Sequence, residues 1–280
     1  MGISASGPFP RDACAYAHKN ISRNCSAARN LGDSTYTENH SGSGIVLSNV
    51  DGATVVWSTA HSNGWHQASH GGGPVGIWAW EACAVVIRHC AAWNNSNGVG
   101  QNDGGGFDLD GGVTDSVVLY SASWANTGAG SMIYQFTGAS ALTNNIVRFC
   151  LSIGGGYDAR NSGGLELFPP TPSTPATLTY IGNTIFTGGI GGRIPRGRGG
   201  GSSGRKVNFP STVHFFPTPA GLLPGAEVSL RRNAFLQPGG GAAAMRGGPL
   251  ILVGWAGSLG NNNSNSTETR LRRQRLRSAE

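Results

Sequence analysis

Charged side chains are scarce in this chain, at 12% of its 280 residues, and only two of them are lysines, Lys19 and Lys206. Stretches of Ala, Leu, Glu and Lys with the spacing of an amphipathic helix are also missing, which argues against long helices. The apolar run at residues 249–255 is too short to span a membrane. Residues 1–10 lack the basic start and apolar centre of a signal peptide.

Cysteines are few and show no metal-binding pattern. No CxxC or Cys/His spacing of a zinc site occurs among the five, which are Cys14, Cys25, Cys83, Cys90 and Cys150. The odd number leaves at least one thiol unpaired within a monomer. Cys14 and Cys25 are spaced to close a small N-terminal loop in an oxidising compartment. Several Asn-x-Ser/Thr sequons favour an extracellular or cell-surface location, at Asn20, Asn24, Asn39, Asn94, Asn262 and Asn265.

Basic residues are concentrated in two segments rather than on the body of the chain. The net charge is +6, but five arginines lie within 270–277 and five further cations within 193–206. Without these ten cations and the acids Glu268 and Glu280, the remaining chain carries a formal charge of −2. A nucleic-acid-binding domain needs a basic face on its folded body. We therefore expect no nucleic-acid partner.

Glycine is abundant, with 46 residues, and together with Asn, Ser and Thr it separates short β-branched runs. This composition is typical of a turn-rich all-β protein, and the absence of a strict three-residue glycine period excludes collagen. A short pattern recurs: Gly, an alternating apolar strand, a turn, and a second apolar strand. The first strands begin at Gly44, Gly76 and Gly106, with further copies at Met132 and Gly164.

The second strands of this pattern are marked by Val55, Val85, Val117, Ile146 and Leu178, about 30 residues apart. A strand-and-turn period of this size predicts a stacked solenoid, and it is too short for a propeller blade. We expect residues 1–40 to form an N-terminal cap or an irregular first coil. Residues 41–258 should form a parallel β-helix with a Gly/Arg-rich insertion at 188–206, and residues 259–280 a disordered basic tail.

The repeats resemble the right-handed parallel β-helix superfamily, pectate lyase-like, which includes pectate lyases, polygalacturonases and other polysaccharide-active proteins. Residues 103–118 and 126–130 carry the resemblance most clearly, and residues 180–185 are similar to the family's recurring Asn-turn coil. The resemblance covers roughly residues 41–255. It implies an all-β fold, a right-handed parallel β-helix solenoid, and a carbohydrate-active protein of unassigned reaction.

The chain departs from the best-known reactions of that superfamily. The paired Asp-Asp and the Arg-Ile-Lys of polygalacturonases are both missing. The lysine-base lyases need a lysine on the groove, whereas Lys19 and Lys206 lie outside the clear coils. An arginine base remains open through Arg88 or Arg148.

Strand alternation predicts which side chains face away from the core. If Ile77 and Phe107 point inward, two outward columns follow from stacking of the coils. One column reads Val46, Trp78, Asp108, then Met132 or Tyr134, Glu166 and His214. The other reads Ser48, Trp80, Asp110, Phe136, Phe168 and Phe216. A polysaccharide groove is expected to combine aromatic rings, which stack on sugars, with carboxylates, which bind hydroxyl groups. The alternative is that the N-terminal segment or a loop simply covers Trp78 and Trp80.

The catalytic candidates are the acids Asp103, Asp108, Asp110 and Glu166. Asp108 and Asp110 share a strand face, so their carboxyl groups could reach the separation of an inverting glycosidase pair. One acid would need a raised pKa to donate a proton. The alternatives are a calcium site built from Asp103, Asp108 and Asp110, or solvated strand and turn residues.

We expect a monomeric polysaccharide-binding protein, either a glycoside hydrolase or a polysaccharide lyase acting on the carboxylate-and-aromatic face. The other class is a non-catalytic surface or adhesion β-helix protein. An open face at Asp108 and Asp110 favours the enzyme, and burial of this face under residues 1–40 disfavours it. The substrate-binding candidates are Trp78, Trp80, Tyr134, His66 and Arg88. Asn63, Asn94 or Asn95, Asn126 and Asn183 are expected to form an internal asparagine ladder rather than to bind ligand.

Overall fold

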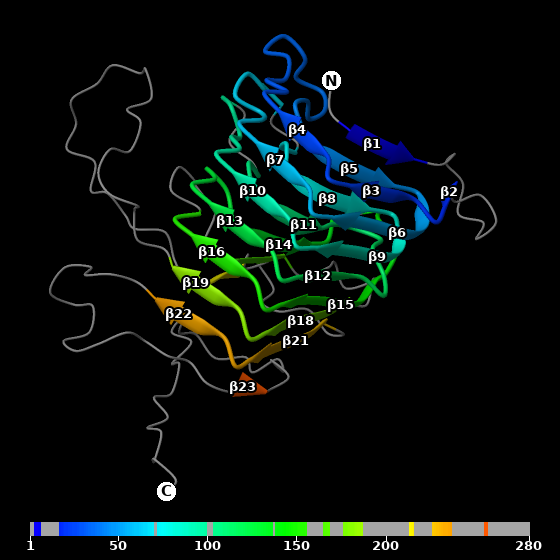
Figure 1. The fold of residues 1–280 in the computed structure, drawn as a ribbon, viewed down its shortest axis with the longest axis vertical. Helices are drawn as coiled ribbons and strands as arrows, with labels where there is room; N and C mark the ends of the chain where they lie inside the picture. The colour runs from blue at the N-terminus through cyan, green and yellow to red at the C-terminus, as the bar shows by residue number, and fades with distance from the viewer. Residues whose placement is uncertain are drawn as a thin grey trace, which may run out of the picture.

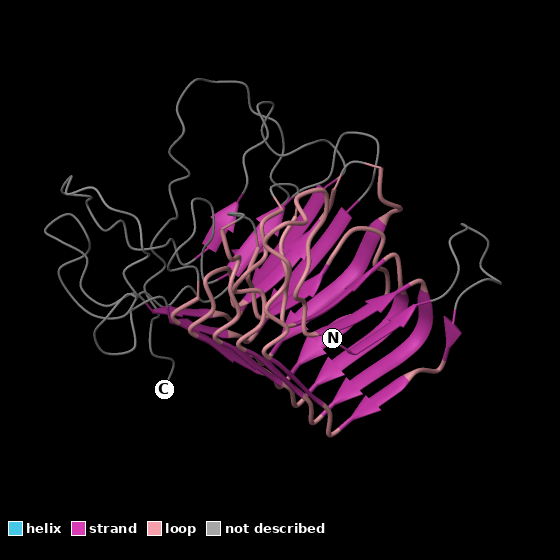
Figure 2. Ribbon diagram, turned by 90° about the horizontal axis from the view of Figure 1, so that it is seen from above, coloured by secondary structure: helices cyan, strands magenta, loops and turns pink. Residues whose placement is uncertain are grey.

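The protein, seen here as a computed structural model, is a parallel β-solenoid without helices in its described part. The structure describes residues 3–6, 17–69, 72–99, 103–136, 138–155, 165–168, 176–186, 213–215, 226–236 and 255–256. Strands of successive coils stack into three sheets, which we name A, B and C (Figures 1 and 2). The expected all-β, parallel β-helix class is confirmed.

Each complete coil contributes one strand to each sheet, in the order A, B, C. Sheet A consists of β1 (Ile3–Ser6), β5 (Ile45–Ser48), β8 (Ile77–Trp80), β11 (Phe107–Leu109), β14 (Ser131–Tyr134), β17 (Leu165–Phe168) and β20 (Val213–Phe215). Sheet B consists of β2 (Ala17–His18), β3 (Ile21–Arg23), β6 (Val50–Val56), β9 (Cys83–Arg88), β12 (Val117–Leu119), β15 (Leu142–Arg148), β18 (Ala176–Ile181), β21 (Ala226–Arg231) and β23 (Trp255–Ala256). Sheet C consists of β4 (Ser26–Ala28), β7 (Thr59–His61), β10 (Ala91–Trp93), β13 (Ala122–Trp124), β16 (Leu151–Ile153), β19 (Thr184–Phe186) and β22 (Ala234–Leu236).

The register confirms the period but corrects the marker residues on sheet B. Val55 pairs with Ile87, and the row continues through Val118, Val147 and Tyr180, at intervals of 29 to 33 residues. Four of the five residues proposed as equivalent are therefore one or two positions out of register. The error arises because β9 and β12 are apolar at several successive positions, so a shifted alignment looks equally good.

The core lies inside the coil and is filled from all three sheets. Ile77 and Phe107 of sheet A point into it, as predicted, and Val85 of sheet B and Ala92 of sheet C are likewise almost fully buried there. Inward positions on sheet C are small, mostly Ala or Ser, which lets its strands lie close to the other two sheets. Removal of these apolar side chains from water is the main stabilisation of the solenoid.

An asparagine ladder closes the corner between sheets C and A. The Nδ2 of Asn63 donates to the Oδ1 of Asn95, and Asn95 donates in the same way to Asn126, each at 3.0 Å. These side chains are fully buried, so each amide satisfies turn groups that water cannot reach. The predicted internal ladder is confirmed for Asn63, Asn95 and Asn126. Asn183 belongs to a second ladder, at the corner between sheets B and C, where it donates to Asn233.

Glycines next to the first ladder explain the glycine that opens each repeat. A Cβ on Gly76 would lie 2.7 Å from the Gly106 carbonyl oxygen and 2.8 Å from the Nδ2 of Asn95. Gly44 and Gly106 are hemmed in similarly by the next coil. The chain therefore needs glycine here for close approach of neighbouring coils, rather than for an unusual φ angle.

The N-terminal part already belongs to the solenoid, since β3 and β4 pair with β6 and β7. The Gly/Arg-rich insertion at 188–206 and the tail at 259–280 lie outside the described residues. The last described strand, β23, pairs antiparallel with β21. A helix long and apolar enough to cross a membrane is not found among the described residues.

Candidate functional site

The outer face of sheet A carries the predicted columns of side chains. Trp78 pairs with Val46 on one side and Asp108 on the other, and Asp108 pairs with Met132. These residues face away from the core, because Trp78 and Met132 form a separate apolar cluster with Val75 and Ala129. The register places Met132, not Tyr134, in the Trp78 column, which settles the choice that the sequence left open. Glu166 and His214 follow in register.

Trp78 is covered although it faces outward. Its side chain is 4% exposed, the His40 ring packs edge-on against it at 5.1 Å, and its Nε1 donates to the Ser43 hydroxyl at 3.2 Å. Burial of the imidazole ring lowers the pKa of His40. The N-terminal segment therefore occupies this part of the face, so Trp78 itself offers no open ring to a sugar.

Trp80 and Tyr134 remain half-buried at the end of the sheet where the strands finish. Trp80 pairs with Ser48, and Tyr134 pairs with Phe168. The predicted second column contained Phe136 at this position. The register places Tyr134 there instead, two residues earlier in the chain. The Phe136 ring instead packs over Gly111, where a Cβ would come within 2.5 Å of it.

Asp108 lies in the middle of β11 with its neighbours Phe107 and Leu109 on the opposite face. It is 3% exposed, so its carboxyl group is enclosed rather than presented to solvent. The outward direction predicted for Asp108 is correct relative to the core, but the face around it is covered.

Asp103 approaches β11 from its start. Its backbone adopts a left-handed conformation with φ of 54°, and its Oδ2 accepts a hydrogen bond from the Gly73 N–H at 2.7 Å. Loss of water around the carboxyl group raises its pKa to about 6, against the lowering effect of the Gly73 bond. Asp103 thus joins the loop at Gly73 to the coil of β11.

Asp110 follows β11 at its other end. Its N–H donates to the Ala79 carbonyl at 2.8 Å, which continues the register beside Trp80, and its Oδ1 accepts from the Gly111 N–H at 2.7 Å. Burial raises its pKa to about 8, opposed by the Gly111 bond and reinforced by the negative charges of Asp103 and Glu81. The effect of these two charges on Asp110 indicates that both acids lie within electrostatic reach of it.

Glu81 is a third acid near Asp110, and the sequence analysis did not indicate it. Its Oε1 accepts from the Ser140 N–H at 2.8 Å, and its carboxylate lies against Gly112, whose φ of 76° and missing side chain leave room for it. We name Glu81, Asp103 and Asp110 the acid cluster. The signal available in sequence was the glycine pair after Asp110, which permits a carboxylate from the preceding coil to approach.

The acid cluster can hold two carboxyl groups in opposite protonation states near pH 7. With a pKa of about 8, Asp110 is mainly protonated there, whereas Asp103, with a pKa of about 6, is mainly ionised. Environments that separate the pKa values of two neighbouring acids mark them as a proton donor and a proton acceptor.

The remaining candidates are not brought into this cluster. His66 is exposed on its turn, and Arg88 is exposed at the end of β9 on sheet B rather than on sheet A. Glu166 is placed only by its backbone pairing with Met132. Within the described residues, no group of three or more His, Cys, Asp or Glu side chains is arranged to hold a metal ion, and the calcium site of Asp103, Asp108 and Asp110 stays a prediction.

The cysteines of the described coils are free thiols: Cys25, Cys83, Cys90 and Cys150. Burial raises the pKa of Cys150 to about 12 and that of Cys83 to about 11. Cys83 also donates to Asp51, which adds to the raised pKa. The partner proposed for Cys25, Cys14, lies outside the described residues. A reactive thiolate is thus not available at Cys83 or Cys150 near neutral pH.

Comparison of the chain with protein-family models, with curated proteins and with solved structures finds no match in any of the three.

Proposed function

We propose that this protein binds a polysaccharide along the outer face of sheet A and cleaves a glycosidic bond at the acid cluster. The observation that carries the proposal is the placement of Asp103 before β11 and Asp110 after it, with Glu81 against Gly112 and the half-buried Trp80 next to Asp110 in register.

The chemistry assigns one proton transfer to each of two acids. Asp110, neutral below pH 8, donates its proton to the glycosidic oxygen as the bond to the sugar carbon breaks. In hydrolysis, the Asp103 carboxylate removes a proton from the attacking water. In β-elimination it removes a proton from the sugar ring, and the electron pair forms the unsaturated product. Burial, reinforced by the negative charges of Asp103 and Glu81, raises the pKa of Asp110 and keeps it protonated before the reaction.

The sequence resemblance supports the substrate class. Coils similar to those of pectate lyase-like proteins surround Asp103 and Asp110, and that superfamily acts on polysaccharides. The missing groove lysine argues for carboxylate chemistry rather than for a lysine base. Several sequons support an extracellular or cell-surface location for the reaction.

A second candidate function is a non-catalytic glycan-binding or adhesion protein of the cell surface. It is favoured by the burial of Trp78 and Asp108, which are 4% and 3% exposed, because a covered centre shortens the groove available to a polymer. The two candidates differ in whether Asp110 meets a substrate oxygen.

The deciding experiment incubates the full chain with a panel of neutral and acidic polysaccharides and measures new reducing ends. Ultraviolet absorbance of an unsaturated product distinguishes elimination from hydrolysis, and parallel reactions with EDTA test the calcium prediction. Asp110→Asn and Asp108→Asn are compared with Asp115→Asn, an exposed aspartate in the bend before β12 whose φ of 52° asparagine tolerates well. Cleavage that needs Asp110 supports the enzyme, whereas binding without turnover on every polymer supports the adhesion protein.

A further inference from the structure

The corner between sheets B and C turns at one residue in each coil, and that residue has a left-handed backbone. The φ angles at this position lie between 48° and 64° in seven successive coils, at Asn24, Trp57, His89, Tyr120, Phe149, Gly182 and Arg232. Large side chains rarely adopt this conformation, which favours Gly, Asn and Asp. Four coils nevertheless place an aromatic ring there, and nothing in the packing of the core requires it.

These four rings, Trp57, His89, Tyr120 and Phe149, form one continuous row that we name the corner row. Their centroids are 4.3, 5.5 and 5.5 Å apart, with interplanar angles of 9°, 13° and 13°. The row runs parallel to the axis of the solenoid, one ring per coil. It contacts solvent along its length, because Trp57, Tyr120 and Phe149 are about half exposed.

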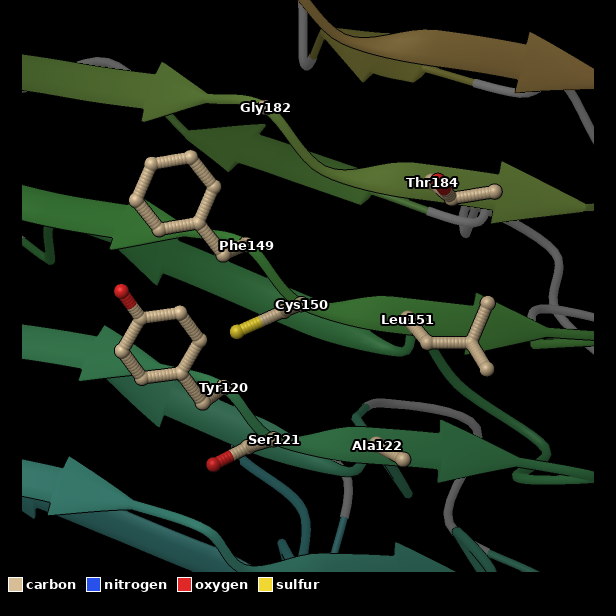
Figure 3. A pocket seen from close by; sticks show the side chains of 8 residues that line it. All are labelled: Tyr120, Ser121, Ala122, Phe149, Cys150, Leu151, Gly182 and Thr184. Carbon is tan, nitrogen blue, oxygen red and sulfur yellow. The ribbon is translucent and has the colours of Figure 1, made fainter.

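The spacing shows that the rings overlap only in part. Nearly parallel rings whose atoms touch at about 3.5 to 4.0 Å must be displaced sideways when their centroids are farther apart. Tyr120 and Phe149, at 5.5 Å, therefore leave part of each face uncovered. Figure 3 shows both rings beside a surface pocket, which Leu151 and Thr184 border on the sheet C side. The volume of this pocket is about 370 Å³.

A second row of rings runs along sheet C, four residues beyond the first. His61, Trp93 and Trp124 occupy paired positions, with centroids 4.3 and 4.8 Å apart. Between the two rows, the outward positions are the small residues Thr59, Ala91 and Ala122. The two rows thus border a strip of low side chains along the axis.

Arginines line the other side of the corner row. Arg23, Arg88 and Arg148 are exposed at the ends of their sheet B strands, immediately before the corner. They alternate with Val56 and Leu119, so an arginine stands at every second coil, roughly 10 Å from the next given the strand spacing. The sheet C strands of the described coils contain no acidic residue to offset this positive charge.

We infer that this corner is a binding site for an acidic polysaccharide lying along the solenoid axis. The apolar C–H faces of successive sugars rest on the uncovered faces of the corner row, one ring per coil. Carboxylate or sulfate groups accept charge-assisted hydrogen bonds from Arg88 and Arg148. The inference deepens the proposed function by naming the class of polymer, and it rests on that proposal only in taking the polymer to be a polysaccharide.

The site is separate from the acid cluster. A coil has three sides, and the corner between sheets B and C is the one that does not border sheet A (Figures 1 and 2). Aromatic and basic residues also bind single-stranded nucleic acid, so a nucleic acid is one of the ligands compared in the test.

The test measures binding of polygalacturonate to the full chain by titration calorimetry. Its methyl-esterified form supplies the same backbone without charge, and oligodeoxythymidylate represents nucleic acid. Tyr120→Asn and Phe149→Asn remove rings while keeping a residue that tolerates the corner, as Asn24 does in the same column. Arg88→Gln with Arg148→Gln removes charge. Tyr36→Asn, an exposed tyrosine outside the strands, is the matched control.

We expect polygalacturonate to bind with an affinity that falls as salt is added. The double ring variant should lower the affinity on the order of tenfold, and the double arginine variant should lower both the affinity and its salt dependence. Tyr36→Asn should bind like the natural chain. Tighter binding of the nucleic acid, equal binding of the esterified polymer, or no binding at all overturns the inference. So does a ring variant that lowers the unfolding temperature but leaves the affinity unchanged.

Asp110→Asn separates this inference from the proposed function. If it abolishes cleavage and leaves the calorimetric affinity intact, both stand. If no variant or substrate shows cleavage but the ring and arginine variants weaken binding, the catalytic proposal fails and the corner site stands. If cleavage depends on Asp110 while the corner variants bind normally, only the corner site fails.

Discussion

Asn95 directs two hydrogen bonds to a single atom of the next coil: its backbone N–H and its Nδ2 both donate to the Oδ1 of Asn126, each at 3.0 Å. The Nδ2 of Asn126 in turn donates to the Ala92 carbonyl at 3.1 Å. All these groups are buried, and none could find water if a partner were removed. One side chain therefore completes the corner of its own coil and that of its neighbour.

Replacing Asn126 by Leu should be severely destabilising. The backbone N–H of Asn95 and one hydrogen of its Nδ2 would be buried without an acceptor, whereas the other Nδ2 hydrogen keeps the Ala60 carbonyl. At about 1 to 3 kcal/mol for each unsatisfied group, we expect the free energy of unfolding to fall by about 3 kcal/mol or more. Urea denaturation measures it. Asn39→Ala, on an exposed turn, should change it by less than about 0.5 kcal/mol. A loss below about 1 kcal/mol in Asn126→Leu would show that the ladder is not a major source of stability.

Gly76→Ala should also destabilise the solenoid, although alanine is a small residue. Its Cβ would press on the Gly106 carbonyl oxygen and on the amide of Asn95, so the coils would have to move apart by a few tenths of an ångström or more. We expect a loss of about 2 kcal/mol or more, as for other overpacked sites. Gly72→Ala is the matched control, since its Cβ would find its nearest neighbour, His40, only at 3.9 Å. Equal stability of the two variants would contradict the close approach of the coils.

The pH dependence of cleavage should be bell-shaped. Activity requires ionised Asp103 and protonated Asp110, whose pKa values of about 6 and about 8 set the acidic and basic limbs. Asp110→Asn should lower kcat on the order of 100-fold or more and remove the basic limb, because the amide cannot donate a titrating proton. Rates measured from pH 4 to 10 on the best substrate of the panel test this, with Asp115→Asn as control. If the basic limb persists in Asp110→Asn, that limb reports the titration of another group.

Stability should decrease as pH rises through the same range. Both aspartates have raised pKa values in the folded state, so above an unfolded-state pKa of about 3.9 the folded chain holds protons that the unfolded chain has released. Their contribution is greatest below pH 4 and is lost by about pH 8. Asp110→Asn should therefore be relatively more stable than the natural chain at pH 8 than at pH 4. Urea midpoints of both proteins at pH 4 and pH 8 measure their difference in stability. If that difference is the same at both pH values, Asp110 is solvated when ionised.

The solenoid was predictable from sequence because it is a repeating pattern. Gly44, Gly76 and Gly106 begin sheet A strands at a common register, and Asn63, Asn95 and Asn126 recur at one corner, so local spacing alone identifies equivalent positions. The sheet B register was less certain, since Val85 and Ile87 both point inward and an alignment on either looks consistent. Hydrogen bonding between coils decides between them, and strand alternation cannot.

The acid cluster could be predicted only in part. Alternation placed Trp78 and Asp108 on the outer side of sheet A, but it carries no information about what packs over that side. His40 and Ser43 cover Trp78 from a segment without a repeat. Glu81 joins the cluster through a turn whose shape depends on Gly112 of the next coil. Such contacts depend on loop conformation, for which a single sequence offers no period to count.

The corner row did leave a signal in the sequence. Each of its rings comes directly before a small polar or thiol residue, as in Trp57–Ser58, His89–Cys90, Tyr120–Ser121 and Phe149–Cys150, and the pairs recur at the period of the coil. The second member points inward and bonds the neighbouring coil, as Ser121 does with the Cys90 N–H at 3.1 Å. The first member then has to point outward, because the chain turns between the two.

A corner that turns on one residue also separates what the coil needs from what its surface offers. The coil requires a left-handed φ at that position and a hydrogen-bonding group at the next, and it is indifferent to the chemistry of the outward side chain. Asn, Trp, His, Tyr, Phe, Gly and Arg all occupy the position in this one chain. A lengthwise stripe of the molecule can therefore change its ligand, residue by residue, while the coils beneath it keep the same packing.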